Sequence, residues 1–79
     1  MSRFHFNVFN TIGDTPDEEG QELADLDAAR TEAIRGIRSL LASEVQDGAM
    51  YLRGRIEIAD PEGRILETIA FQDAVTIER

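Results

Sequence analysis

The chain begins with a stretch in which apolar and polar residues alternate. One side of an extended backbone there would carry Phe4, Phe6 and Val8, and the other side would carry His5, Asn7 and Phe9. This period of two predicts a half-buried strand over residues 3–10. Residues 11–17, which include a glycine and a proline, predict a turn, and residues 18–23 are expected to return as a short second strand.

The next segment repeats its apolar residues at helical spacing. Asp25 is the expected N-cap, because its carboxylate can accept the free amide hydrogens of the first helical turn. At about 100° per residue, the apolar stripe consists of Leu26, Ala29, Ala33, Ile34, Ile37, Leu40, Leu41 and Val45. We expect the helix to end near Gln46 or Asp47, with Gly48 as its left-handed C-terminal cap.

Two residues of this helix depart from the simple pattern. Gly36 lies in the interior, where glycine costs about 1 kcal/mol relative to alanine. Together with Ala29 and Ala33 it forms a small-residue flank. This flank could let the helix approach a sheet or another helix closely, and the alternative is that Gly36 is merely tolerated. Arg30 lies inside the apolar stripe, and we expect it to form a structural salt bridge back to the acidic residues 18–22.

The second half of the chain reads as a hairpin. Alternation returns over residues 52–59 and stops at Asp60-Pro-Glu-Gly, a strong turn signal. Pro61 presets the backbone of the second turn position, and Gly63 suits the left-handed position that closes the hairpin. Residues 64–71 are expected to pair back as the next strand, and residues 74–78 are expected to form a short final strand or a tail.

This order of elements predicts a single small α+β domain over residues 1–79, with the order ββαββ and the segment at 74–78 as a candidate fifth strand. One amphipathic helix would lie across one face of a small antiparallel sheet. Because both faces of the predicted sheet are partly apolar, we expect the uncovered face or an edge strand to meet another chain. The residues expected at that interface are His5, Phe9, Tyr51, Arg53, Arg55 and Leu66.

Composition narrows the possible functions. A chain of 79 residues has a thin stability margin, and without cysteines it has no disulfides to add to it, so oligomerisation is favoured. Sixteen acidic and eight basic residues give a net charge of -8, which repels nucleic-acid phosphates and anionic membranes. With no long apolar run, the chain is expected to be soluble and cytoplasmic, with no nucleic-acid or membrane partner.

The acidic segment 14–27 holds seven carboxylates, so divalent cation binding is the first chemistry to consider. The calcium-loop pattern fails, because a loop starting at Asp14 would place Pro16 at a ligand position and Glu19 at the required glycine. A solvated acidic turn is the interpretation we favour. His5 is the only histidine, and the serines show no activating partner. We therefore expect no metal site, no cofactor and no enzymatic activity.

The chain resembles a family of short bacterial proteins described as a domain of unknown function. The resemblance is carried by the aromatic first strand, by the block Asp-Glu-Glu-Gly-x-Glu-Leu-x-Asp-Leu-x-Ala-Ala-Arg-x-Glu-Ala over residues 17–33, by the acidic turn at residues 60–63, and by Phe-x-Asp-Ala at residues 71–74. A weaker similarity to antitoxins of the HicB type covers only the order of strand, acidic turn and helix. This chain lacks the DNA-binding segment that many of those antitoxins carry.

Three hypotheses about function follow. The leading one is a non-enzymatic protein-interaction module that forms a homodimer. The second is an acidic regulator that masks a basic protein surface, in the manner of an antitoxin or a nucleic-acid mimic. The third is a small-ligand binder or minor enzyme with a pocket between helix and sheet, built from Phe4, Phe6, Phe9, Tyr51 and Phe71. Aromatic residues at alternating spacing are far more often core residues than cofactor sites.

Overall fold

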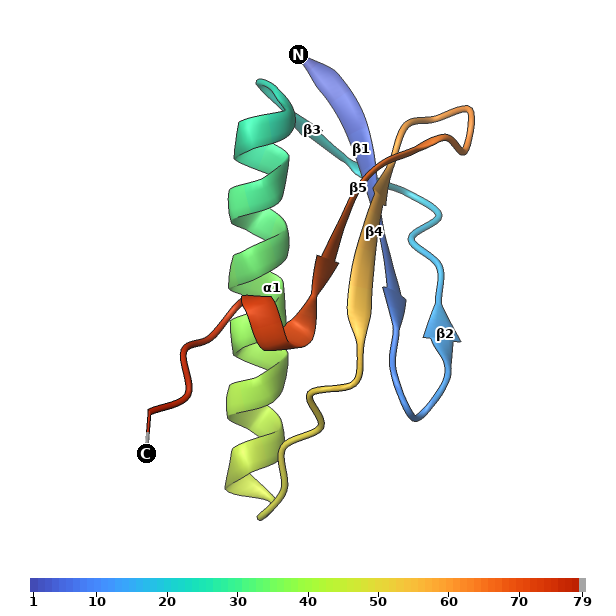
Figure 1. The fold of residues 1–79 in the computed structure, drawn as a ribbon. Coiled ribbons are helices and arrows are strands. Elements are labelled where there is room, and N and C mark those ends of the chain that lie inside the picture. Colours follow the sequence, from blue (N-terminus) through green and yellow to red (C-terminus); the bar gives the residue numbers. More distant parts are fainter. Residues whose placement is uncertain (79) are drawn as a thin grey trace.

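The computed structural model describes residues 1–78 and shows one helix lying across a small antiparallel sheet, the α+β arrangement that the sequence predicts (Figure 1). The elements follow one another as β1 (Ser2–Phe9), β2 (Asp14–Thr15), β3 (Gln21–Leu23), α1 (Leu26–Gln46), β4 (Arg55–Ala59), β5 (Ile65–Ala70) and a 3-10 helix, η1 (Phe71–Asp73). The fifth strand is therefore β2, inside the predicted turn. No strand forms within residues 74–78, which are the tail.

Strand β1 lies inside the sheet and is paired along both sides. On one side it pairs antiparallel with β4, which in turn pairs antiparallel with β5. On the other side it has two short partners, β3 near its beginning and β2 near its end. The sheet order is β2-β1-β4-β5, with β3 also on β1, so β5 forms one edge and the two short strands share the other.

The strand register separates an apolar inner face from a partly apolar outer face. Phe6 lies opposite Ile58, and Ile56 lies opposite both Val8 and Ile69, which places these side chains on the face that α1 covers. The residues between them, and Ile65 opposite Ala59, line the outer face: His5, Asn7, Phe9, Arg55, Glu57, Ala59, Ile65, Thr68 and Ala70. The uncovered face is therefore partly apolar, as the sequence predicts, with four apolar residues among five polar ones.

Helix α1 has the predicted caps. The Asp25 carboxylate accepts a hydrogen bond of 2.8 Å from the amide of Ala28, and Gly48 follows the C-cap residue with a φ of 95°. Along the stripe, Ala29, Ala33, Ile37 and Leu41 are buried, while Leu26, Ile34 and Leu40 are partly buried. Val45 departs from the prediction with an exposed fraction of 54%, because the last turns of α1 extend past the strands (Figure 1).

Phe71 is the largest fully buried side chain of the core, together with Ile37 and Ile58. Its backbone amide donates to the carbonyl of Gly54 at 2.9 Å, and a methyl group on Gly54 would lie 2.4 Å from the Phe71 ring. Since Phe71 already belongs to η1, regular strand pairing does not continue to this point. The predicted strand over residues 52–59 therefore begins only at Arg55.

The turn between β4 and β5 forms as the sequence predicts. Pro61 occupies the second position, and Gly63 adopts a φ of 89° and donates to the Asp60 carbonyl at 2.9 Å. The Asp60 carboxylate also accepts hydrogen bonds from the amides of Glu62 and Arg64. The bond from the Arg64 amide is the main reason why the pKa of Asp60 lies below its ordinary value. Asp60 thus closes the hairpin with both its backbone and its side chain.

Candidate functional site

The six residues predicted to form an interface fall in three separate places. His5, Phe9 and Arg55 lie on the outer face of the sheet. Tyr51 and Arg53 lie in the segment that connects α1 to β4 and are exposed. Leu66 lies on the edge strand β5 and is 43% exposed. The structure therefore does not gather these six residues into one surface.

The outer face is occupied by contacts among its own side chains. The Arg55 guanidinium lies 4.3 Å from the centre of the Phe9 ring, a cation-π contact, and its Nε donates to the Glu57 carboxylate at 3.0 Å. Nδ1 of His5 lies 2.7 Å from the carbonyl oxygen of Asp17. The Phe9 ring is thus covered by an arginine, and the apolar side chain that stays exposed at this face is Ile65, at the edge of the sheet opposite Ala59.

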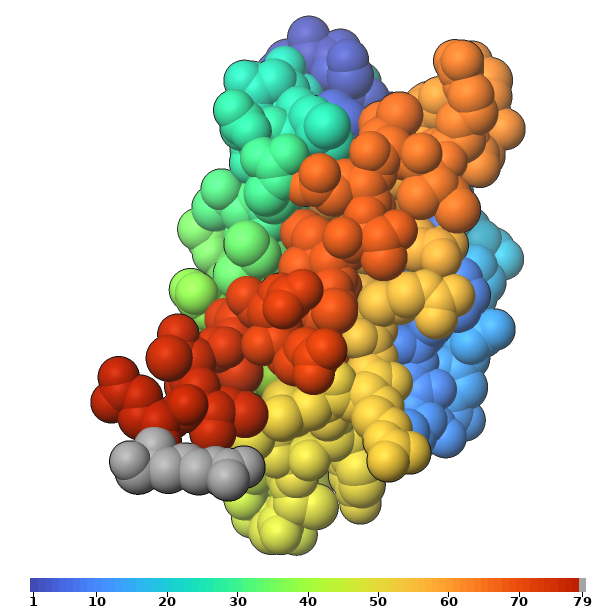
Figure 2. Space-filling view, viewed as in Figure 1, coloured from blue at the N-terminus to red at the C-terminus, as the bar shows by residue number. Residues whose placement is uncertain are grey.

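The edge strand β5 is a more accessible candidate surface. It is the outermost strand of the sheet on its side, and Figure 2 shows it crossing one face of the molecule with no other segment over it. Ile65 is 57% exposed and lies beside Leu66. Between Ala59 and Ile58 of β4 the register advances by two residues on β5, from Ile65 to Glu67, which makes Leu66 the extra residue of a bulge.

The opposite edge of the sheet is interrupted. Between the parts of β1 that pair with β3 and β2, Asp17 takes the place of a strand partner. Its carboxylate accepts hydrogen bonds from the amides of Phe6, at 3.0 Å, and Gly20, at 3.1 Å, and its own amide donates to the Asn7 side chain at 2.8 Å. The acidic turn therefore satisfies the backbone of β1 at the point where no strand covers it.

Arg30 closes one flank of the helix. It donates to the Glu67 carboxylate on β5 and to Asp27 one turn earlier in the helix. The hydrogen bond between Arg30 and Glu67, supported by charge attraction, lowers the pKa of Glu67 and raises the pKa of Arg30. The predicted salt bridge to residues 18–22 is wrong, because the stripe position of Arg30 faces β5 and not the acidic turn.

Farther along the same flank, η1 and the segment after it cover the helix. The Nε atom of Arg38 donates to the Ala74 carbonyl at 2.7 Å, and Ala74 is buried beside Phe71. The space between helix and sheet is therefore filled on this side. The Arg30–Glu67 ion pair, η1 and the tail after it each contribute.

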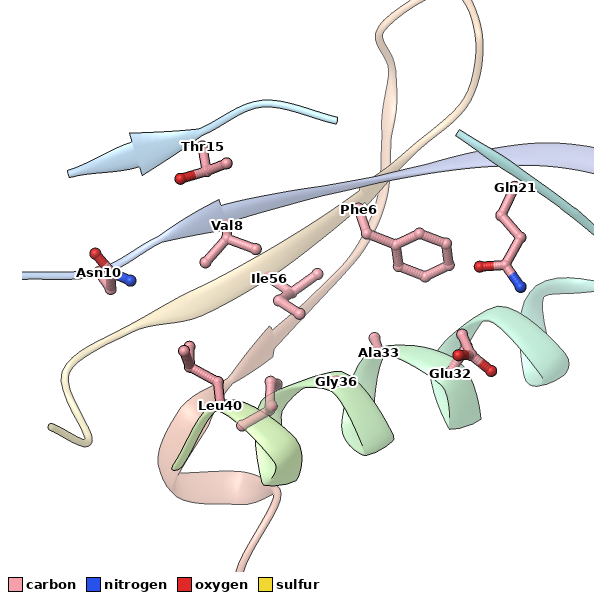
Figure 3. A pocket seen from close by; sticks show the side chains of 11 residues that line it. Phe6, Val8, Asn10, Thr15, Gln21, Glu32, Ala33, Gly36, Leu40 and Ile56 are labelled. Carbon is pink, nitrogen blue, oxygen red and sulfur yellow. The ribbon is translucent and has the colours of Figure 1, made fainter. Parts of the chain in front are cut away.

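The other flank of α1 leaves an apolar groove of about 450 Å³ above β1. Figure 3 shows its floor, formed by strand residues, and its wall, formed by the helix. The lining residues are Phe6, Val8, Asn10, Thr15, Gln21, Glu32, Ala33, Gly36, Ile37, Leu40 and Ile56. Of the five aromatic residues proposed for a pocket at this interface, the lining includes Phe6 alone.

Gly36 determines the shape of this groove. Nothing lies within 4 Å of the position that a Cβ atom would occupy there, so the close approach considered for the small-residue flank does not occur at this glycine. The sequence signal for the groove was thus the glycine in the helix interior, one turn before Leu40, which the structure shows to be half-buried. It could not be interpreted without knowing that the helix crosses β1 at a distance.

The polar groups of the groove lie at its two ends. Figure 3 shows Gln21 and Glu32 at one end and Asn10 at the other, with the apolar side chains between them. Glu32 has a 35% exposed side chain, and its contact with Arg35 is long, at 3.5 Å. Glu32 is the only charged residue in the lining, so the groove carries negative charge at one end.

Within residues 1–78, no three histidine, cysteine, aspartate or glutamate side chains are grouped in a way that could hold a metal ion. In the same residues, no helix combines the length and the apolar character needed to cross a membrane.

Comparison with known proteins adds one relationship. No curated protein and no solved structure matches the chain significantly. The family model described as "Domain of unknown function (DUF6894)" matches residues 3–72, from the second residue of β1 to the second residue of η1. Since the match spans the sheet, the helix and both candidate surfaces, the chain belongs to the DUF6894 family.

Proposed function

We propose that this domain is a non-enzymatic protein-interaction module that forms a homodimer by pairing its edge strand β5 with the β5 strand of a second copy. The observation that carries the proposal is the exposure of Ile65 and Leu66 on an uncovered, six-residue edge strand. Exposed strand edges invite pairing with another chain, and natural proteins usually protect them.

The chemistry of β5 suits such pairing. A two-fold axis would bring two β5 strands together antiparallel, so each copy would contribute the same surface. Glu67, the acidic residue of the strand, is already paired with Arg30, which reduces the repulsion between two copies. Burying the two exposed aliphatic side chains of each copy would supply an apolar contribution in addition to the backbone hydrogen bonds.

The oligomeric state of the protein tests this proposal directly. Sedimentation equilibrium at about 100 µM is expected to give a dimer mass for the wild type. Ile65→Lys should shift the protein to a monomer, because the interface would then bury two unpaired ammonium groups. Ile12→Lys is the matched control, since Ile12 is 84% exposed and lies on the loop after β1. A monomeric wild type, or equal effects of the two variants, would contradict the proposal.

The second candidate function is the masking of a basic protein surface. It is favoured by the net charge of -8 and by the exposure of Glu18 and Glu19 in the acidic turn and of Glu22 in β3. The order of strand, acidic turn and helix is also the feature that resembles HicB-type antitoxins. This function predicts capture of a basic protein at low salt, with an association rate that falls steeply as salt rises. Absence of such a partner in a low-salt pull-down would count against it.

A further inference from the structure

We propose that the groove between α1 and β1 binds a small amphipathic cation, with its hydrocarbon body along Phe6, Val8 and Leu40 and a primary ammonium head at Glu32. The groove lies on the flank of α1 opposite β5, so this inference does not depend on the proposed dimer.

The size and lining of the groove favour a small apolar body. Its volume of about 450 Å³ falls in the range usual for ligand sites, and most such sites combine an apolar lining with a few placed polar groups. The side chains of Phe6, Val8 and Leu40 pack against the core but are only partly buried. A hydrocarbon chain in the groove would remove their remaining apolar surface from water, which is favourable in proportion to the area buried.

Gly36 is the second observation. An interior glycine weakens a helix relative to alanine. Here it also leaves a gap without side-chain atoms in the wall of the groove, between Ala33 and Leu40. Because nothing lies within 4 Å of its would-be Cβ, a side chain added there would begin in open space, with no other part of the protein against its first atom. Position 36 therefore controls the space available to a ligand separately from the packing of the core.

The charge at one end of the groove selects the class of ligand. The Glu32 carboxylate is a hydrogen-bond acceptor for an ammonium group, and the side-chain carbonyl of Gln21 lies at the same end (Figure 3). Among residues 1–78, the cation paired with Glu32 is Arg35, which is largely exposed and makes a long contact, so a bound ammonium can replace it at little cost. A carboxylate ligand would meet repulsion from Glu32 and from the net charge of -8.

The test compares three probes of equal chain length: octylammonium, octanol and octanoate. Each is titrated into ¹⁵N-labelled wild-type protein while amide chemical shifts are followed. Octylammonium is expected to bind most tightly, octanol less tightly and octanoate least, with the largest shifts at the amides of Ala33, Gly36 and Leu40. Equal binding of all three probes, or shifts confined to residues outside the groove, would overturn the proposal.

Two variants separate the apolar part of the site from its charge. Gly36→Met is expected to weaken binding of octylammonium and octanol alike by about tenfold or more, because its side chain fills the groove. Glu32→Gln is expected to weaken octylammonium about tenfold while leaving octanol unchanged.

Glu62→Gln is the matched control, since it removes one negative charge from the exposed turn at residues 60–63. Circular dichroism must show that every variant keeps the wild-type fold; at position 36 the open space around the would-be Cβ leaves room for the first side-chain atom. If Glu32→Gln and Glu62→Gln reduce octylammonium binding equally, the effect is one of net charge and the assigned ammonium position is wrong.

Discussion

The two flanks of helix α1 meet the same sheet in different ways. Toward β5, an ion pair, a 3-10 helix and a buried aromatic ring fill the space between helix and sheet. Toward β1, the helix presents a glycine and a groove remains. A small domain can thus fill one side of a helix with core side chains and leave an open groove on the other side.

The largest expected effect comes from opening the sealed flank. Phe71→Ala removes a fully buried ring and should lower the free energy of unfolding by about 3–5 kcal/mol. In a domain of this size such a loss approaches the total stability. Urea denaturation of Phe71→Ala and Phe71→Leu, followed by circular dichroism, measures it. If Phe71→Ala were no less stable than Phe9→Ala on the outer face, the sealed flank would not dominate stability.

Crowding the sealed flank should have the next largest effect. Gly54→Ala places a methyl group 2.4 Å from the Phe71 ring, so the ring must move. Overpacking of this kind costs about 1–3 kcal/mol. The urea midpoint should fall while the dependence of the unfolding free energy on urea stays constant. A neutral Gly54→Ala would mean that Phe71 has more freedom than its complete burial indicates.

The same substitution on the open flank should act in the opposite direction. Gly36→Ala places its methyl group in empty space and improves helix propensity, so the free energy of unfolding should rise by about 0.5–1 kcal/mol. Thermal unfolding of Gly36→Ala beside Gly54→Ala provides a matched pair of glycine substitutions. Destabilisation by Gly36→Ala would show that the helix lies closer to a neighbour there than the groove implies.

The smallest effect concerns the ion pair and depends on pH. Because the pKa of Glu67 is lowered in the folded protein, its charged form contributes stability above its ordinary pKa of 4.5, and this contribution is lost as pH falls through the folded value. Glu67→Gln should therefore be less stable than the wild type at neutral pH, and the difference should close in acid. Urea titrations at about pH 7 and about pH 3 measure it. Asp60 has a pKa shifted in the same direction and remains in both proteins, so it cancels from the comparison. A difference that does not change with pH would exclude the ion pair as its cause.

The elements could be predicted because their signals are local. The alternation in β1, the cap at Asp25, the glycine after the helix and the turn at residues 60–63 each depend on neighbouring residues, and the structure contains all of them. The predictions that failed depend on distant pairings. The partner of Arg30 is 37 positions away, and the start of β4 depends on Phe71, which lies 17 positions after Gly54.

The groove depends on a crossing geometry that no local pattern specifies. The sequence placed Leu40 and Ala33 on the helix stripe, and it placed Phe6 and Val8 on one side of β1. It did not indicate that a groove opens between these two sets, with Gly36 in its helical wall between Ala33 and Leu40 (Figure 3). The face on which Ile65 lies was not predictable either, because regular alternation would place it with Ile69, whereas the bulge at Leu66 pairs it with Ala59 of the outer face.

The interruption of the sheet edge at Asp17 has a consequence for higher assembly. A sheet with two continuous edges can add copies on both sides and grow into a fibre. Here two short strands and an aspartate occupy one edge, which leaves β5 as the one continuous edge among the described residues. Two copies joined through β5 would have no further long edge to offer, so growth would stop at the pair. A partly buried turn carboxylate would thereby limit the number of chains in the assembly.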